Sequence, residues 1–515
     1  MKRVFGLSSI VVLSALLFAT GLSRTTASEK KVLQSDAPTF SNEVVRIFQK
    51  DCQVCHRPGD IAPFSLLTYR EARPWARSIQ EKVVTRQMPP WKATAGCGEF
   101  QDERKLTDDE IATISRWVDA GAPEGDPAQL PEPTNFNSGW ILGEPDLILS
   151  PDEDYTVQPG DDVYRCFTMP TNLKGDRFIQ AVDIKPGNRN VVHHVILYLD
   201  DTGASVALDE RDPGPGYTSF GGPGFTMTGT LGGWAPGIRP AYEPDGIAWK
   251  VRAGTRIVAQ VHYHPRSTAE KDRTQIGIYY SRKPVKKEIG VVPIINTTFN
   301  IPAGSSAHSV SASVPIPPGF DAHAIGIAPH MHLLGKKMKV EARSATKTDC
   351  LINIEDWNFN WQNIYHYKEP IPLKSPVLLS LNATYDNSSN NPYNPNSPPK
   401  SVRWGEQTTD EMCIAFILYT LDSENLAPSA PQVNDVFVDA SGRLVVKGKG
   451  FLPGADIEIN GVRVKDTRNH KKAKKASKEL SSSEDWRQYI TSGAMVDVKV
   501  LNTDGVHSET FRFKM

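Results

Sequence analysis

Residues 138–424 carry the pattern that most restricts the folds open to this chain, namely short apolar or alternating runs separated by Gly and Pro. Such runs occupy residues 191–198, 256–263, 377–381 and 414–419. A period of two residues predicts β-strands with one buried face, and no stretch here is long enough for a convincing helix. The length of the region suits two tandem β-sandwich domains of about 145 residues each, at 134–283 and 284–424.

Regions of different character flank the predicted sandwiches. Residues 38–125 show helical periodicity, including a capping box at Thr107 and Glu110, and they predict a small all-α domain. A Pro-rich linker follows at 123–133. Residues 430–515 alternate again and predict one immunoglobulin-like β-sandwich. The fold class is therefore mainly β, with a helical domain before the two tandem sandwiches and a third sandwich after them.

Composition and the N-terminal segment restrict function and location. The 515 residues contain 58 Lys and Arg against 59 Asp and Glu, so the chain lacks the basic excess typical of nucleic-acid binding. Lys2 and Arg3 precede an apolar run that is too short to span a bilayer, and small residues follow at 25–27. We expect a secretory signal peptide over 1–27, a periplasmic or secreted mature protein and no membrane span after signal removal. A retained anchor is the alternative.

A C-x-x-C-H motif at residues 52–56 predicts covalent haem attachment. In this spacing Cys52 and Cys55 can add to the two haem vinyl groups while His56 supplies an axial nitrogen. A zinc half-site would need a second ligand pair in the helical region, and a redox dithiol would not need the histidine. We therefore expect one covalently attached haem c.

Met88 is the predicted second axial ligand, because it is the only methionine in residues 38–125. Two prolines follow it and stiffen the loop that must present the sulfur to iron, and Trp91 can pack on the porphyrin. Ligation by His and Met leaves no open position on iron and suits electron transfer. The whole segment resembles a small class I c-type cytochrome domain.

Histidines cluster at three places after residue 190. In a strand, residues i and i+2 share a face, so His330 and His332 can bind one metal from one surface. The adjacent His193 and His194 point to opposite faces of a regular strand and can share a metal only at a bulge or a strand end. Three clusters in one exported chain favour metal binding.

The predicted metal is copper. Imidazole suits zinc, copper and nickel, but a thioether ligand selects copper because soft sulfur stabilises Cu(I). Met412, within Asp410-Glu411-Met412-Cys413, is a candidate thioether ligand.

Four motifs in order resemble the copper type II ascorbate-dependent monooxygenases, a family that includes peptidylglycine α-hydroxylating and dopamine β-monooxygenases. These motifs are His193-His194, Gln260-Val261-His262-Tyr263, His330-Met331-His332-Leu333-Leu334-Gly335 and Asp410-Glu411-Met412-Cys413. The resemblance implies two copper ions. It also implies O2, a small-molecule C–H substrate, and a one-electron donor that is an ascorbate-like reductant or a redox protein.

By this resemblance each copper has its own ligand set. The electron-transfer copper would lie in the first sandwich on His193, His194 and His262, and His264 is a rival to His262 on the same strand face. The catalytic copper, where O2 is activated, would lie in the second sandwich on His330, His332 and Met412. His323 is expected at the surface.

Departures from the family pattern bear on the substrate and the disulfides. Ala328 and Phe416 stand where the peptidylglycine enzyme has an Arg that grips the substrate carboxylate and an assisting Tyr, so an apolar or aromatic C–H substrate is expected. The residues 379–385 lack the cysteine that would pair with Cys413, and the pairing of the cysteines outside the C-x-x-C-H motif stays open. These are Cys97, Cys166, Cys350 and Cys413.

The C-terminal residues and the chain as a whole each have one further interpretation. Residues 430–515 resemble the IPT/TIG immunoglobulin-like modules of secreted bacterial proteins, which implies an accessory or surface-binding role. For the whole chain, the alternative to a hydroxylase is a periplasmic copper-binding and electron-transfer protein without hydroxylase activity.

Overall fold

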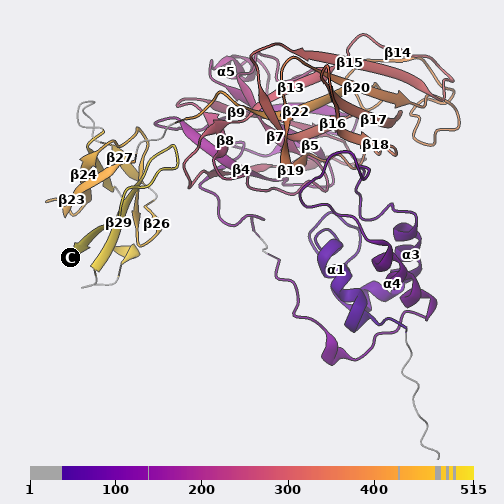
Figure 1. Cartoon of the computed structure of the whole chain (residues 1–515), viewed down its shortest axis with the longest axis horizontal. Helices are drawn as coiled ribbons and strands as arrows, with labels where there is room; N and C mark the ends of the chain where they lie inside the picture. Colours follow the sequence, from indigo (N-terminus) through magenta and orange to yellow (C-terminus); the bar gives the residue numbers. More distant parts are fainter. Residues whose placement is uncertain are drawn as a thin grey trace, which may run out of the picture.

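The computed structural model describes residues 37–136, 139–426, 430–464, 466–469, 477–482, 486–490 and 495–514. Within them the protein is mainly β, with a helical region on one side of a central β body and a smaller β unit at one end (Figure 1). No helix among these residues is long and apolar enough to cross a membrane. The predicted signal peptide lies outside the described residues.

The helical region packs around one apolar core. Its elements are η1 (Phe40–Val44), α1 (Val45–Asp51), α2 (Tyr69–Ala72), η2 (Arg73–Trp75), α3 (Ala76–Val84), α4 (Asp108–Asp119) and η3 (Pro127–Gln129). The predicted capping box is present at the start of α4, where Thr107 and Glu110 each accept a backbone N–H of the other. Phe48 and Trp117 are fully buried between α1 and α4.

The first pair of large sheets encloses a core that includes Val195, Val261 and Ile278. One sheet has the order β1 (Leu147–Leu149), β11 (Gln275–Tyr280), β4 (Arg177–Lys185), β8 (Ile247–Val251) and β12 (Lys287–Glu288). The other has the order β6 (Tyr217–Thr218), β3 (Val163–Pro170), β9 (Arg256–Tyr263), β5 (Val192–Asp200) and β7 (Gly229–Trp234). A small ribbon of β2 (Tyr155–Val157) and β10 (Glu270–Asp272) and a short helix, α5 (Ala204–Asp209), complete this unit.

The second pair of sheets comes next in the chain and has its own apolar core. One sheet has the order β13 (Gly290–Ile295), β22 (Ile414–Leu421), β16 (Ala322–His330) and β19 (Tyr365–Leu373). The other has the order β15 (His308–Ile316), β20 (Val377–Tyr385), β17 (Gly335–Arg343) and β18 (Thr348–Ile354), and β14 (Asn300–Ile301) pairs with β21 (Val402–Arg403). All pairings within these sheets are antiparallel.

A third pair of four-stranded sheets forms the C-terminal unit. One holds β23 (Gln432–Val438), β24 (Leu444–Lys449), β28 (Glu479–Ser482) and β27 (Thr467–Asn469), and the other holds β26 (Val462–Arg463), β25 (Asp456–Ile459), β29 (Met495–Leu501) and β30 (Phe511–Lys514). A 3-10 turn, η4 (Trp486–Tyr489), lies between β28 and β29 in sequence. Ion pairs of Arg177 with Asp456 and of Arg463 with Asp146, each at 2.9 Å, attach this unit to the first sandwich.

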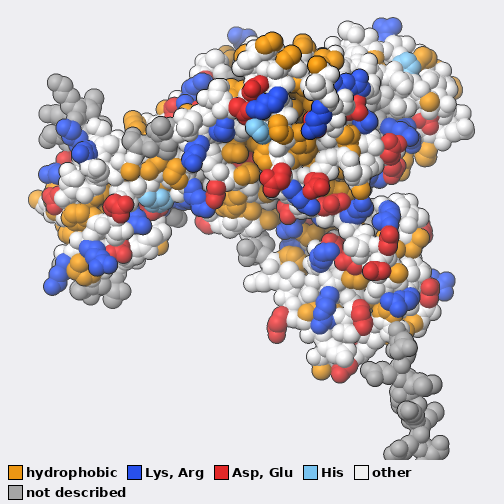
Figure 2. Space-filling model, in the orientation of Figure 1, with side chains coloured by type: hydrophobic (Ala, Val, Ile, Leu, Met, Phe, Trp, Pro, Cys, Tyr) orange, Lys and Arg blue, Asp and Glu red, His pale blue; other side chains and the backbone are white. Residues whose placement is uncertain are grey.

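Charge is mixed on the molecular surface. Figure 2 shows Lys and Arg side chains interspersed with Asp and Glu side chains over the face in view. This distribution agrees with the net charge of −1 and offers no single basic surface on that face of the described residues.

The helical region is joined to the second sandwich by the segment before α4. Ala93 forms a β-bridge with Ile354, and Phe100 forms one with Tyr367, so both belong to the second sandwich core. The ring of Trp91 packs against that of Tyr365 in that core, with the centroids 5.1 Å apart. A contact of Trp91 with the porphyrin stays a prediction.

A disulfide fixes the same junction. Cys97 is bonded to Cys350 in β18, across a sequence separation of 253 residues. Cys166 and Cys413 are free and buried. The pairing that the sequence left open is therefore Cys97 with Cys350, and Cys413 has no disulfide partner among the described residues.

Replacing both Cys97 and Cys350 with Ser is expected to lower the free energy of unfolding by about 2–4 kcal/mol, because the bond closes a long loop of the unfolded chain. Differential scanning calorimetry should show a lower midpoint for the transition that includes the second sandwich. A reductant should lower the wild-type midpoint to the same value and leave the double variant unchanged. Equal midpoints for the wild type and the double variant, each with and without reductant, would contradict a stabilising role of the disulfide.

Candidate metal centres

The first histidine cluster is built on a β-bulge between β5 and β9. Val192 pairs with Tyr263 and His194 pairs with His262, so the register shifts by one residue and His193 is the extra residue. A bulge turns the side chains of neighbouring residues toward one side of a sheet. This irregularity is the one that adjacent histidines need in order to bind the same metal ion, as we expected from the sequence.

Three imidazole nitrogens converge at this bulge. His194 Nδ1 lies 3.2 Å from His193 Nδ1 and 3.4 Å from His262 Nδ1. Three nitrogens at about 2.0 Å around one metal ion in a plane are about 3.5 Å apart, so this spacing fits a metal. Burial lowers the pKa of His193 to about 3 and also lowers the pKa of His194, which keeps both rings neutral and able to bind a metal.

Asp162 lies on the outer side of the first cluster. Its Oδ2 lies 3.1 Å from His262 Nε2, and its other oxygen lies 2.8 Å from His264 Nδ1. Tyr164 stacks on the His262 ring with the centroids 4.2 Å apart. The side chain of His264 is 66% exposed and stands outside the three-histidine group, so the structure groups His262 and not its rival with the pair at the bulge.

The second histidine cluster lies at the end of β16. His330 is the last residue of that strand and His332 follows it, with their ring centroids 5.1 Å apart. His330 Nδ1 lies 2.5 Å from Gln362 Oε1, and His332 Nδ1 lies 3.1 Å from the Asp410 carbonyl oxygen. Both Nδ1 atoms therefore donate to oxygen, which leaves the Nε2 atoms available to a metal.

Burial also keeps this second pair neutral. It lowers the pKa of His330 to about 4 and that of His332 to about 3. Neutral imidazole is the form that binds a metal.

Met412 lies just before β22, and His332 lies just after β16. The last pair of these two strands is His330 with Ile414, and His332 Nδ1 lies 3.1 Å from the carbonyl oxygen of Asp410, two residues before Met412. Tyr385 Oη donates a hydrogen bond of 2.7 Å to the Met412 carbonyl oxygen. The chain segment that carries the candidate thioether is thus held against the second histidine pair.

Glu411 fixes the two segments to each other. Its fully buried carboxylate accepts backbone N–H groups of His332 at 2.9 Å, Leu334 at 2.7 Å and Met412 at 3.0 Å. Burial raises the pKa of this carboxyl group to about 8. The sequence motif predicted no role for Glu411, although its position next to a candidate ligand was a usable signal.

Glu411→Ala should leave three buried N–H groups without an acceptor. We expect a loss of about 3 kcal/mol in the free energy of unfolding and a 10- to 100-fold loss of Cu(I) affinity at the second cluster, on the order of other losses of ligand support. Urea unfolding and chelator competition would measure the two effects. Glu369→Ala, at an exposed position of β19, is the matched control and should change neither quantity.

The positions that depart from the family pattern adjoin the second cluster. Ala328 and Phe416 pair directly across β16 and β22, and Ala328 shares a sheet face with His330 two residues later. Both side chains are half-buried. This face offers an alkyl and an aromatic surface beside the candidate ligands.

The C-x-x-C-H motif follows α1 in a tight turn. Cys52 and Cys55 are free and half-buried, and the backbone N–H of His56 donates to the Cys52 carbonyl oxygen at 2.9 Å. His56 Nδ1 lies 3.1 Å from the Phe64 carbonyl oxygen. This contact directs the Nδ1 proton to Phe64 and leaves Nε2 free to act as a ligand of iron. The turn therefore fits a covalently attached haem.

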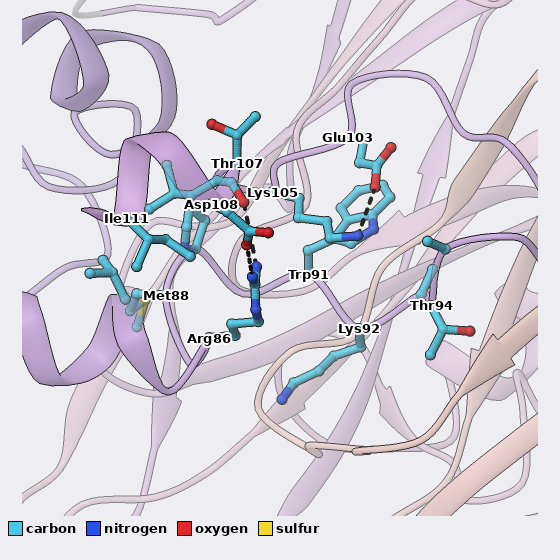
Figure 3. A pocket seen from close by; sticks show the side chains of 15 residues that line it. Arg86, Met88, Trp91, Lys92, Thr94, Glu103, Lys105, Thr107, Asp108 and Ile111 are labelled. Carbon is cyan, nitrogen blue, oxygen red and sulfur yellow. Dashed lines mark hydrogen bonds and ion pairs between the residues drawn. The ribbon is translucent and has the colours of Figure 1, made fainter. Parts of the chain in front are cut away.

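Met88 lines a cavity of about 690 Å³ between α3, α4 and the segment that leads to the second sandwich. Figure 3 shows Arg86 paired with Asp108 on its wall and Trp91 further along it. Cys52, Cys55 and His56 are not among the described residues that line this cavity. Joint ligation of one iron by His56 and Met88 therefore stays a prediction.

The fold and these sites define a class of β-sandwich protein with two histidine clusters. Residues 285–434 match the family model of the copper type II ascorbate-dependent monooxygenase, C-terminal domain. The match covers the second cluster, including His330, His332 and Met412, and it supports this family of copper-dependent oxidoreductases.

Similarity to solved structures is remote. The major capsid protein P2 of bacteriophage PM2 is 9% identical with a TM-score of 0.27, over 55% of this chain and 98% of that one. VP2 of infectious bursal disease virus is 8% identical with a TM-score of 0.16, over 56% and 80%. A putative secreted protein from Eubacterium rectale is 11% identical with a TM-score of 0.17, over 52% and 69%. Scores of this size do not establish a common fold.

Proposed function

We propose that this protein is a secreted or periplasmic copper-dependent monooxygenase that hydroxylates a C–H bond of a small molecule. The reaction is R–H + O2 + 2e⁻ + 2H⁺ → R–OH + H2O. The observation that carries the proposal is the family match over residues 285–434, which covers His330, His332 and the segment of Met412 that Glu411 joins to His332. The Cys97–Cys350 disulfide supports an oxidising compartment.

Each cluster would hold one copper ion, which supplies one-electron transfer at the first site and oxygen activation at the second. His193, His194 and His262 would bind the first ion through their Nδ1 atoms. His330 and His332 would bind the second through their Nε2 atoms, with the Met412 sulfur. Gln362 and the Asp410 carbonyl would hold those two rings in orientation through Nδ1.

The substrate is proposed to be apolar or aromatic near its reacting carbon. Ala328 and Phe416 present no charge or hydrogen-bond donor beside the second cluster, so a substrate carboxylate would lose its hydration without gaining a partner there. These two side chains therefore favour a substrate with a hydrocarbon or aromatic surface over one with a peptide carboxylate.

The helical region is proposed to carry one haem c and to relay electrons to the first copper. Arg104, in the segment before α4, supports this role because it donates to the Gly237 carbonyl oxygen at 3.1 Å and to Asn363 Oδ1 at 3.4 Å. One side chain of the haem region thus contacts both sandwiches. An ascorbate-like reductant or a redox protein would reduce the haem.

Oxygen uptake by copper-loaded, haem-containing protein with a one-electron reductant would test the hydroxylase proposal. We expect O2 consumption that requires a C–H substrate, equals the hydroxylated product in amount, and is absent from copper-free protein. The alternative is a copper-binding and electron-transfer protein. It would be supported if both sites bound copper and were reduced while a broad panel of apolar C–H compounds failed to increase O2 uptake.

A further inference from the structure

The segment between β18 and β19 contacts both histidine clusters. Phe359, which is 9% exposed, stacks on the His193 ring with the centroids 5.0 Å apart and the planes at 20°. The same ring meets His332 edge-on, with the centroids 5.6 Å apart and the planes at 73°. A single aromatic side chain therefore touches one proposed ligand of each copper site.

The rest of this segment is held by the second cluster. Trp357 Nε1 donates to the His332 carbonyl oxygen at 3.1 Å. Gln362 accepts from His330 through Oε1 and donates through Nε2 to the Phe359 carbonyl oxygen at 2.9 Å. The segment that carries Phe359 is thus hydrogen-bonded to both residues of the second histidine pair, and the Phe359 ring packs on the first cluster.

We propose that Phe359 is a positioning residue that couples the two copper sites, so that copper at one site strengthens copper binding at the other. The inference rests on the proposed function, because it requires that both clusters bind copper. Copper on His332 would fix that ring and with it the edge contact to Phe359. The fixed Phe359 ring would then hold His193 in its ligating orientation, and the second ion would meet a cluster that is already ordered.

A second link between the clusters provides a matched comparison. Asp162 lies 3.1 Å from His262 Nε2 and accepts a hydrogen bond of 2.7 Å from Thr408 Oγ1, four residues before Met412. This link joins the same two sandwiches through polar groups and does not involve Phe359. Thr408→Val removes its hydrogen bond and keeps the side-chain shape.

The test measures Cu(I) affinity at the first site by chelator competition, on full-length haem-containing protein stripped of copper. Met412→Ile keeps both contact rings but leaves the second site empty at low copper. We expect it to weaken first-site binding about two- to tenfold, the range set by one aromatic contact. In a Phe359→Leu background the same Met412→Ile change should have no effect on first-site affinity.

Several outcomes decide the proposal. The proposal is overturned if Met412→Ile weakens first-site binding as much in the Phe359→Leu background as in the wild-type background. It is also overturned if Met412→Ile no longer weakens first-site binding in a Thr408→Val background in which Phe359 is intact. If Phe359→Leu does not fold, Phe359→Met, which fills irregular space, should give the same result. Failure of wild-type protein to bind two copper ions would instead overturn the proposed function. The EPR spectrum of Cu(II) at the first site gives an independent readout and should differ between wild type and Met412→Ile only when Phe359 is present.

Discussion

Met412→Ile is expected to reduce hydroxylation by about 100-fold or more. Loss of a group that only supports a metal ligand costs about 10- to 100-fold, and this substitution removes the proposed ligand itself. Isoleucine is apolar and similar in size, so the substitution removes the sulfur and keeps most of the packing. Without a thioether the second site loses its preference for Cu(I), the form that reacts with oxygen. The three-histidine site has no ligand on this segment and should remain filled.

Copper analysis and product assays would separate these effects. Under limiting chelator the copper content should fall from two ions per chain to one, while the haem content stays constant. Met331→Ile is the matched control, because Met331 lies between His330 and His332 in sequence but is buried in the apolar core. That control should retain both copper ions and turnover, and retained turnover in Met412→Ile would exclude Met412 as the ligand.

His194→Ala is expected to stop copper-dependent oxidation of the haem. His194 Nδ1 is the central nitrogen of the first cluster, within 3.4 Å of both neighbouring Nδ1 atoms, so its removal leaves no three-nitrogen site. The helical region, which we propose carries the haem, is tethered by a short linker and by the Cys97–Cys350 bond, which give it a high effective concentration at the sandwiches. Electron transfer from the proposed haem to copper would then need no diffusive encounter.

A single-turnover experiment would measure this step. The haem is reduced beforehand, oxygen and substrate are added, and the haem absorbance is followed with and without copper. His264→Ala is the control, since this exposed histidine lies near the first cluster without belonging to it. Its haem should reoxidise at the wild-type rate. Reoxidation of wild-type haem at one rate regardless of copper would contradict the relay and leave the hydroxylase proposal standing.

Local sequence determined much of the secondary structure. The alternating run at 256–263 has the bounds of β9, and the box at Thr107 and Glu110 begins α4, because each depends on neighbouring residues alone. The bulge at His193 could also be anticipated, since adjacent histidines on a regular strand cannot bind the same metal ion. The period-two spacing of His330 and His332 similarly predicted their common side, although only His330 lies within the strand.

Tertiary structure alone decided what surrounds those ligands. Phe359 and Gln362 lie in an irregular segment without periodicity. Gln362 reaches His330 within the second sandwich, and Phe359 reaches His193 only because this segment packs against the first sandwich. The choice of Cys350 as the partner of Cys97 and the packing of Trp91 on Tyr365 likewise depend on residues more than 250 positions away. Periodicity reports which face of an element is buried, whereas the identity of the group that covers it is set by how distant elements pack.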